Sequence, residues 1–203
     1  MTRVFLASRN PKKLTELRRI LAAAVPGVQV LGLDDVTPYD EPAETEQKFE
    51  GNALIKARAG AAASGLPTLA DDSGICIDAL NGMPGVLSAR WAGRARDDTA
   101  NNQLVLEQLC GTPEDRRGAE FRCAAALCLP GGREHVECGV LRGRVLTAMR
   151  GSNGFGYDVL FSAEGKSRTN AELSDEEKDT ISHRGQALRA IAPVVADWLG
   201  SDS

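Results

Sequence analysis

Short apolar runs alternate with segments of helical periodicity along most of the chain. The first apolar run, residues 4–7, has the length of a strand, and leucines recur at helical spacing after Asn10 and Pro11. Asn10 suits the N-cap of that helix and Pro11 suits its first turn. The pattern therefore predicts a strand–loop–helix unit whose free backbone N–H groups could attract an anion.

The same pattern predicts the remaining elements of an α/β chain. The expected strands are 28–33, 66–70, 75–77 and the two arms of a long hairpin, 120–129 and 134–146; the expected helices are about 46–64, about 98–109, one that starts at the capping box 174–177, and a last one from 182 toward 199. The helix at 46–64 carries a narrow stripe of small apolar residues, so we expect it to pack closely on a neighbour.

Two adjacent carboxylates, Asp71 and Asp72, follow the strand predicted at 66–70, and Ser73 comes next. Open α/β sheets bind ligands beyond the carboxyl ends of their strands, so this position favours a binding site. Neighbouring strand residues face opposite ways, so we expect the two carboxylates to have different tasks. One can hold a hard cation or a water, while the other ties down the turn. The alternative is a plain turn that caps the strand.

The amino-acid composition limits the kinds of molecule that we expect the protein to bind. The chain has 203 residues, 42% hydrophobic and 26% charged, with a formal net charge of -4. This balance implies neither a general nucleic-acid surface nor a polyanionic membrane surface. No signal-peptide pattern or membrane-spanning apolar run is present, so we expect a cytoplasmic protein. The five cysteines lie mostly in apolar runs without a C-x-x-C, which favours buried, reduced thiols over a zinc site.

Three further loops carry candidate binding groups. Lys13 lies in the first turn of the first predicted helix, which is unfavourable for the helix dipole unless an anion is near; the alternative is a solvated lysine beside Glu16. Phe155 stands between glycines that let the backbone approach a flat ligand, or it fills the core. Residues 182–184 place His183 and Arg184 as donors at a helix start, although an ordinary surface histidine is the alternative.

Together these loops offer cations, carboxylates and an aromatic face. That set of groups suits a nucleoside triphosphate with Mg²⁺. The acidic segment 34–47 could supply a second carboxylate to the metal, or it is a solvated loop.

The chain resembles the inosine triphosphate pyrophosphatases (XTP/dITP diphosphohydrolases) in five stretches that follow that family's order. They are Ser8-Arg9-Asn10-Pro11-Lys12-Lys13, 69–74, 88–93, 154–158 and 171–185. The resemblance implies an α/β fold with an elongated mixed sheet, flanking helices and two lobes around a central active-site cleft, the second lobe at roughly 115–165. It also implies a Mg²⁺-dependent homodimer that hydrolyses deaminated purine triphosphates, such as ITP, dITP and XTP, to the monophosphate and pyrophosphate.

The resemblance further assigns roles to residues of this chain. Asp72 is similar to the family's catalytic base and metal-associated carboxylate, and Glu44 to a second metal position. The substrate-binding residues that it implies are Ser8, Arg9, Asn10, Pro11, Lys12, Lys13, Ser73, Phe155, Gly156, Tyr157, Asp158, Lys178, His183 and Arg184. The chain departs from the pattern at Gly51, where relatives often carry glutamate, which leaves Glu50 as a competitor of Glu44.

Two other functions fit part of the pattern. One is a pyrophosphatase for modified pyrimidine nucleotides, and the other is a nucleotide-binding sensor without turnover. The joint presence of Asp72, Lys13 and Lys178 argues against the sensor, because binding alone does not require a poised carboxylate. No G-x-x-x-x-G-K-[ST] motif occurs, which disfavours a phosphotransferase.

Overall fold

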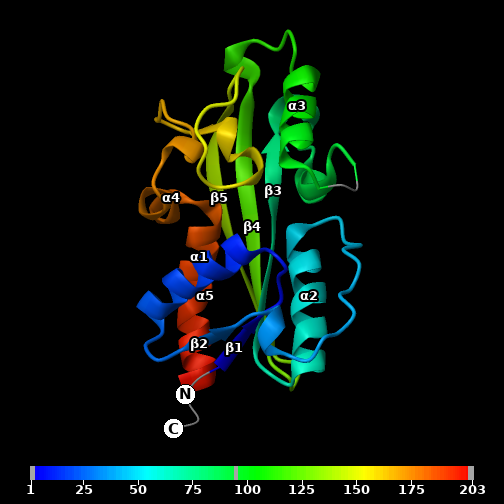
Figure 1. Cartoon of the computed structure of the whole chain (residues 1–203), viewed down its shortest axis with the longest axis vertical. Helices are drawn as coiled ribbons and strands as arrows, with labels where there is room; N and C mark the ends of the chain where they lie inside the picture. The colour runs from blue at the N-terminus through cyan, green and yellow to red at the C-terminus, as the bar shows by residue number, and fades with distance from the viewer. Residues whose placement is uncertain (1–2, 94–95, 201–203) are drawn as a thin grey trace. The chain divides into compact units, whose positions relative to one another are not determined.

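The computed structural model describes residues 3–93 and 96–200 (Figure 1). The strands are β1 (Arg3–Leu6), β2 (Gln29–Leu31), β3 (Thr68–Ile77), β4 (Gly118–Cys128), β5 (Glu134–Val145) and β6 (Phe161–Ala163); the α-helices are α1 (Pro11–Ala24), α2 (Phe49–Ser64), α3 (Asp98–Gln108), α4 (Asp175–Ile181) and α5 (His183–Gly200). The strands form one sheet in the order β2-β1-β3-β4-β5-β6. β1 is parallel to β2 and β3, whereas β5 and β6 are antiparallel, so the predicted mixed α/β fold is confirmed.

The chain divides into two compact units. The first unit comprises Met1–Asp72, Cys123–Gly139 and Arg184–Ser203, and the second comprises Ser73–Arg122 and Val140–His183. Each unit is built from separate stretches of chain, and each has its own hydrophobic core. The lobe limits expected from the sequence stay a prediction.

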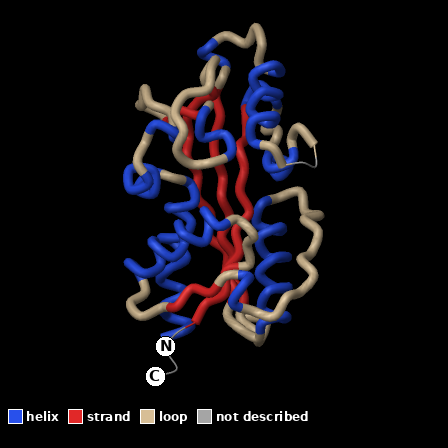
Figure 2. The backbone as a smooth tube through the Cα atoms, viewed as in Figure 1, coloured by secondary structure: helices blue, strands red, loops and turns tan. Residues whose placement is uncertain are grey.

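The first unit is a three-layer arrangement of helices on a sheet (Figures 1 and 2). Alternate residues of β1 point to opposite faces. Val4 and Leu6 pack in one core with buried residues of α1 and α5, including Leu17 and Ile191. On the other face Phe5 contacts α2, where a Cβ at Gly60 would lie 3.0 Å from the Phe5 ring. The predicted small stripe of α2 is confirmed as buried: Phe49, Ala53, Ala57 and Ala61.

The strand prediction around the paired carboxylates was wrong in one respect. Asp71 and Asp72 do not end a strand, because β3 runs without interruption from Thr68 to Ile77. Gly74 allows this continuity, since a Cβ there would overlap the carbonyl oxygen of Gly85 and the hydroxyl of Ser88. That hydroxyl accepts a hydrogen bond from the N–H of Ile75 at 2.9 Å. The segment predicted as a turn is therefore strand, held by a neighbouring 3₁₀-helix.

The second unit packs α3 against strands and a short 3₁₀-helix, Gly156–Val159. Its core joins Val105 and Leu109 of α3 to Phe121 of β4 and Phe161 of β6. The two phenylalanine rings lie 4.7 Å apart between centroids. In the part of β4 that belongs to the first unit, every residue from 123 to 128 is buried, so both faces of the strand are covered there.

All five cysteines are free thiols. Cys123 and Cys128 are buried, whereas Cys110 and Cys138 are exposed, so the expected burial holds for only part of the set. Within residues 3–93 and 96–200, no helix is long and apolar enough to cross a membrane.

Candidate active site

The loop between β1 and α1 leads into a helix start that Asn10 caps in the first unit, so the free N–H groups expected there are already bonded. The Asn10 side chain caps α1 by accepting hydrogen bonds from the backbone N–H groups of Lys12 at 2.9 Å and Lys13 at 3.4 Å. The hydroxyl of Ser8 accepts a hydrogen bond from the N–H of Asn10 at 3.3 Å. The first turn of α1 contains no acidic side chain. The predicted N-cap is therefore confirmed, and the positive end of the helix is left without a carboxylate of its own.

A buried cluster of two cations and two carboxylates lies beside this helix start. Lys13 Nζ is 2.8 Å from Asp71 Oδ2, and Arg184 Nε is 3.2 Å from the same oxygen. Arg184 Nη1 also donates to Glu16 Oε2 at 2.8 Å. The relative exposure of Asp71, Arg184 and Glu16 is 6%, 3% and 7%, so each of these charges needs its partner. The structure thus brings Lys13, Asp71 and Arg184 together, and it shows Glu16 turned toward Arg184 rather than paired with Lys13.

The two cations of this cluster stabilise the ionised form of Asp71. Burial alone would raise the pKa of Asp71, but Lys13 and Arg184 hold that pKa well below its usual range. Burial also raises the pKa of the Cys123 thiol, which donates to Asp71 Oδ2 at 3.8 Å. Asp71 is therefore an ionised group that fixes Lys13 and Arg184. It lies within β3, so it does not tie down a turn, as was expected for one of the two carboxylates.

Asp72 faces a different set of partners, on α2 and the acidic loop. Lys56 Nζ lies 3.1 Å from Asp72 Oδ1 and 2.9 Å from Glu44 Oε1. Asn52 Nδ2 donates to Asp72 Oδ2 at 3.2 Å, and Asn52 Oδ1 accepts from the N–H of Glu46 at 2.9 Å. Burial raises the pKa of Asp72 and Glu44 adds to the effect, while Lys56 opposes it. The pKa values of Asp71 and Asp72, adjacent carboxylates of one strand, are thus shifted in opposite directions.

The donor set around Asp72 fits a hard divalent cation. Within the described part of the chain, no three His, Cys, Asp or Glu side chains are grouped to hold a metal. Asp72 and Glu44, however, direct oxygens at one shared ammonium group. Mg²⁺ is commonly held by one or two carboxylates and completes its shell with water and phosphate oxygens. Glu50 accepts a hydrogen bond from the Cys138 thiol at 3.7 Å, whereas Glu44 shares the Lys56 ammonium group with Asp72.

The second unit contains the glycine–aromatic loop. Lys178 Nζ lies 2.7 Å from Asp158 Oδ2 and 5.1 Å from the centroid of the Phe155 ring. The N–H of Phe155 donates to the same Asp158 oxygen at 3.0 Å. Gly154 has a φ of +77°, and a Cβ there would overlap the Asp158 carboxylate. Glycine is therefore required where this loop closes on the Lys178–Asp158 ion pair.

Two aromatic residues of the predicted set are buried. The Tyr157 hydroxyl donates to the carbonyl oxygen of Ser88 at 2.8 Å, and burial raises its pKa. The His183 ring stacks on Phe121 with centroids 4.8 Å apart and an interplanar angle of 9°. His183 is 6% exposed, so the alternative of an ordinary surface histidine is wrong.

The remaining predicted residues lie on the surface or between surface and core. Arg9 is exposed and forms an ion pair with Glu41 at 2.6 Å, whereas Pro11 and Lys12 lie in the exposed first turn of α1. Ser73 is partly buried and is the first residue of the second unit.

Sequence reasoning missed three polar residues of the first unit. Asn52 and Lys56 are four residues apart on α2 and therefore share one face, which was a usable signal. Glu16 was considered only as a neighbour of Lys13. Its contact with Arg184 joins residues 168 apart in sequence, and no local pattern encodes such a distance.

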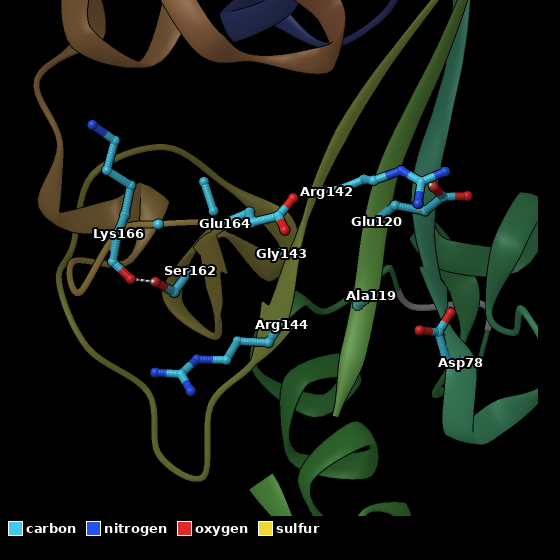
Figure 3. Close-up of a pocket in the computed structure, with 11 residues that line it drawn as sticks. Asp78, Ala119, Glu120, Arg142, Gly143, Arg144, Ser162, Glu164 and Lys166 are labelled. Carbon is cyan, nitrogen blue, oxygen red and sulfur yellow. Dashed lines mark hydrogen bonds and ion pairs between the residues drawn. The ribbon is translucent and has the colours of Figure 1, made fainter. Parts of the chain in front are cut away.

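The second unit also has a hollow of about 520 Å³, which none of the predicted site residues lines (Figure 3). Figure 3 shows Arg144 and Lys166 on one side of it and Arg142 with Glu120 on the other. Arg142 is largely exposed and lies 3.9 Å from Glu120.

The mixed sheet defines an α/β protein. The groups around Asp71 and around Asp72 are suited to a polyphosphate and a divalent cation. The chain belongs to the Ham1 family, whose model matches residues 4–194. It is 58% identical over 197 residues to the dITP/XTP pyrophosphatase of Nocardia farcinica, with 97% of this chain and 96% of that protein covered. It is 57% identical over 205 residues to the dITP/XTP pyrophosphatase of Frankia alni, with 98% and 100% covered.

The similarity to solved structures supports the same family assignment. The nucleoside-triphosphatase / dITP/XTP pyrophosphatase of Mycobacterium abscessus gives a TM-score of 0.77 at 53% identity, covering 95% of this chain and 100% of that chain. A HAM1 protein from Coxiella burnetii gives a TM-score of 0.87 at 40% identity, covering 97% and 100%. The resemblance seen in the sequence is therefore confirmed at the level of the family.

Proposed function

We propose that the protein hydrolyses deaminated purine nucleoside triphosphates, ITP, dITP and XTP, to the monophosphate and pyrophosphate, and so removes them from the nucleotide pool. The observation that carries the proposal is the similarity along nearly the whole chain to relatives named dITP/XTP pyrophosphatase. The ion clusters around Asp71 and Asp72 support it chemically, because cleavage of a phosphoric anhydride requires cations for the phosphates and a carboxylate for water or metal.

In this proposal the first unit handles the triphosphate. The ammonium group of Lys13, together with the positive end of the α1 dipole, attracts phosphate oxygens, with Ser8 and Asn10 shaping the loop. Asp71 holds Lys13 at 2.8 Å, so the ammonium group is positioned before substrate arrives. Arg9, Pro11 and Lys12 extend the same loop toward solvent, and Ser73 follows the carboxylates as a further substrate contact.

Asp72 and Glu44 are proposed to hold Mg²⁺. When bound, the ion would neutralise charge on the phosphates and on the leaving pyrophosphate. Asp72 itself orients the attacking water, either directly as a base or as a ligand that fixes the water. A raised pKa suits a general base, because a base is most effective when its pKa approaches the working pH.

The second unit is proposed to bind the base. Phe155 stacks on the purine, and Lys178 donates to the oxygen at C6 of hypoxanthine or xanthine, with Gly156, Tyr157, Asp158 and His183 completing the contacts of this unit. Arg184, a residue of the first unit, is proposed as a further substrate donor. Adenine presents an amine at C6, which would leave a donor facing a donor. An unpaired buried polar group costs about 1–3 kcal/mol, so discrimination of roughly tenfold to hundredfold per contact is expected.

The proposal includes a homodimer and a cytoplasmic location. The decisive experiment is incubation with ITP, XTP, GTP and ATP plus Mg²⁺, with separate assays for pyrophosphate and orthophosphate. Release of pyrophosphate from ITP and XTP, well above the rates with GTP and ATP, is the expected result. Orthophosphate release would reject cleavage between the α- and β-phosphates. Tight binding without turnover would support a sensor, and preference for a modified pyrimidine triphosphate would support the other alternative.

A further inference from the structure

We propose that Asn102 and Asp98, at the start of α3, are positioning residues that hold the peptide unit of Gly156 and thereby fix the Phe155 ring for the base. This inference rests on the proposed function, because it assigns a role in binding the purine. Neither residue is part of the predicted site, and both belong to the second unit.

The contacts form a closed clamp on one glycine. Asn102 Nδ2 donates to the carbonyl oxygen of Gly156 at 2.8 Å and to the carbonyl oxygen of Asp98 at 2.7 Å. The N–H of Gly156 donates to Asp98 Oδ2 at 2.7 Å. Both polar groups of the Gly156 backbone are therefore bonded to the same helix end, more than fifty residues away in sequence.

The clamp acts directly next to the aromatic residue. Gly156 has a φ of +62°, a left-handed conformation that glycine adopts without strain. Phe155 precedes it, and the N–H of Phe155 is bonded to Asp158 at 3.0 Å. The Phe155 backbone is thus held on both sides, while its side chain stays partly exposed. Holding the backbone in this way limits the directions in which the ring can point, so less freedom is lost when a base stacks on it.

The chemistry of Asn102 argues against a purely space-filling role. Asn102 is 2% exposed, and its Oδ1 has no hydrogen-bond partner within the described residues, so the buried amide serves as a donor only. A buried polar group with an unsatisfied oxygen is costly, and an apolar side chain would fill the same space at lower cost. The donation to Gly156 is what an apolar residue could not supply.

The chain provides two matched controls. Asn101 is also 2% exposed, and its side chain makes two hydrogen bonds among the described residues, to Ala92 and Ala89 rather than to Gly156. Asp97 neighbours Asp98 and caps α3 by accepting from Thr99 and Ala100. Substitution of either control perturbs the same helix start without touching the 154–158 loop.

The test compares Asn102→Leu and Asp98→Ala with Asn101→Leu and Asp97→Ala. Binding of IMP and of pyrophosphate with Mg²⁺ is measured by calorimetry, ITP hydrolysis by steady-state kinetics, and folding by thermal denaturation. For Asn102→Leu and Asp98→Ala we expect IMP affinity to fall and KM for ITP to rise about five- to tenfold, the effect of losing one or two hydrogen bonds. Turnover and pyrophosphate affinity should change less than about twofold, because these depend on the first unit. The controls should alter Tm without weakening IMP binding.

Asp98→Ala keeps the test decisive if Asn102→Leu fails to fold, because Asp98 is exposed. Wild-type IMP affinity in the folded clamp variants, or equal losses in the controls, would overturn this inference alone. A wild-type protein that neither binds IMP nor hydrolyses ITP would overturn the proposed function with it. Hydrogen exchange at the Gly156 amide distinguishes failure of this inference from failure of the proposed function. Loss of the clamp must accelerate the exchange of this amide, whatever the substrate is.

Discussion

Asp71 and Asp72 are consecutive residues of β3, yet Asp71 Oδ2 lies 2.8 Å from Lys13 Nζ and Asp72 Oδ1 lies 3.1 Å from Lys56 Nζ. The two lysines come from α1 and α2, which cover opposite faces of the sheet in the first unit. Lys13 and Arg184 therefore hold the pKa of Asp71 well below its usual range, while burial raises the pKa of Asp72. This difference in environment separates a structural carboxylate from a candidate catalytic one.

Asp72→Asn should abolish most activity and leave the fold intact. The amide keeps the size of the side chain but cannot accept a proton or bind a hard cation well, so kcat for ITP should fall about a hundredfold or more. Pyrophosphate release measures the effect, and thermal denaturation checks folding. Asp78→Asn, at the exposed residue that directly follows the same strand, is the control and should retain wild-type kcat. Near-normal turnover in Asp72→Asn would reject the role proposed for it.

Lys56→Met should move the acid side of the pH–rate profile to higher pH. Burial raises the pKa of Asp72 and Lys56 opposes this, so removal of Lys56 lets the pKa rise further. Because the ionised carboxylate is the active form, activity should be lost at a higher pH than in the wild type as the solution is acidified. A kcat/KM profile from pH 4.5 to pH 9 tests this. Lys48→Met, on an exposed residue before α2, should leave the profile in place; an unshifted Lys56→Met profile would show that Asp72 does not control it.

Asp71→Asn should destabilise the protein near neutral pH, and the difference from wild type should shrink in acid. The folded-state pKa of Asp71 is depressed below its ordinary value of 3.8, so its contribution is present above that pH and is lost as pH falls below it. Leaving Lys13 and Arg184 without this carboxylate should cost about 3–5 kcal/mol at pH 7.

Urea midpoints at pH 7, 5 and 3 measure the effect of Asp71→Asn. Glu134→Gln breaks the exposed Arg58–Glu134 ion pair and should cost less than about 1 kcal/mol. A constant difference between Asp71→Asn and wild type at all three pH values would contradict the assignment.

Arg117→Met should destabilise the second unit without a specific effect on catalysis. The Arg117 guanidinium is buried and donates to the carbonyl oxygens of Leu109, Val145 and Leu146, each at 2.9 Å. The substitution removes three hydrogen bonds, although Leu109 O keeps the one from the N–H of Thr112 at 3.0 Å, so the free energy of unfolding should fall by about 2 kcal/mol or more. Arg117→Lys should recover only part of the lost free energy of unfolding, because an ammonium group lacks the fixed, planar arrangement of N–H donors of a guanidinium.

Chemical denaturation and the kcat of the folded fraction give the two readouts for Arg117. Arg116→Met alters the exposed neighbour and should be near neutral. Equal stability of Arg117→Met and Arg116→Met would mean that water replaces the lost donors.

The sequence by itself determined most of the elements. Asn10 and Pro11 predicted the start of α1, and Ser174 with Glu177 predicted the start of α4, because helix caps are made by residues within one helical turn. The stripe of α2 was also readable, since helical periodicity records which face is buried. The family resemblance depended on the same kind of local information, namely motifs in a fixed order.

Only the tertiary structure decided what the polar residues contact. It extended β3 through Asp71 and Asp72, because Ser88 and Gly85 approach Gly74 from a distant loop. It paired Arg184 with Glu16 and Asp71, and it placed Lys56 between Asp72 and Glu44. The physical reason is that capping and periodicity act over a few residues, whereas the pairing of buried charges depends on which side chains the packed helices bring within hydrogen-bond distance.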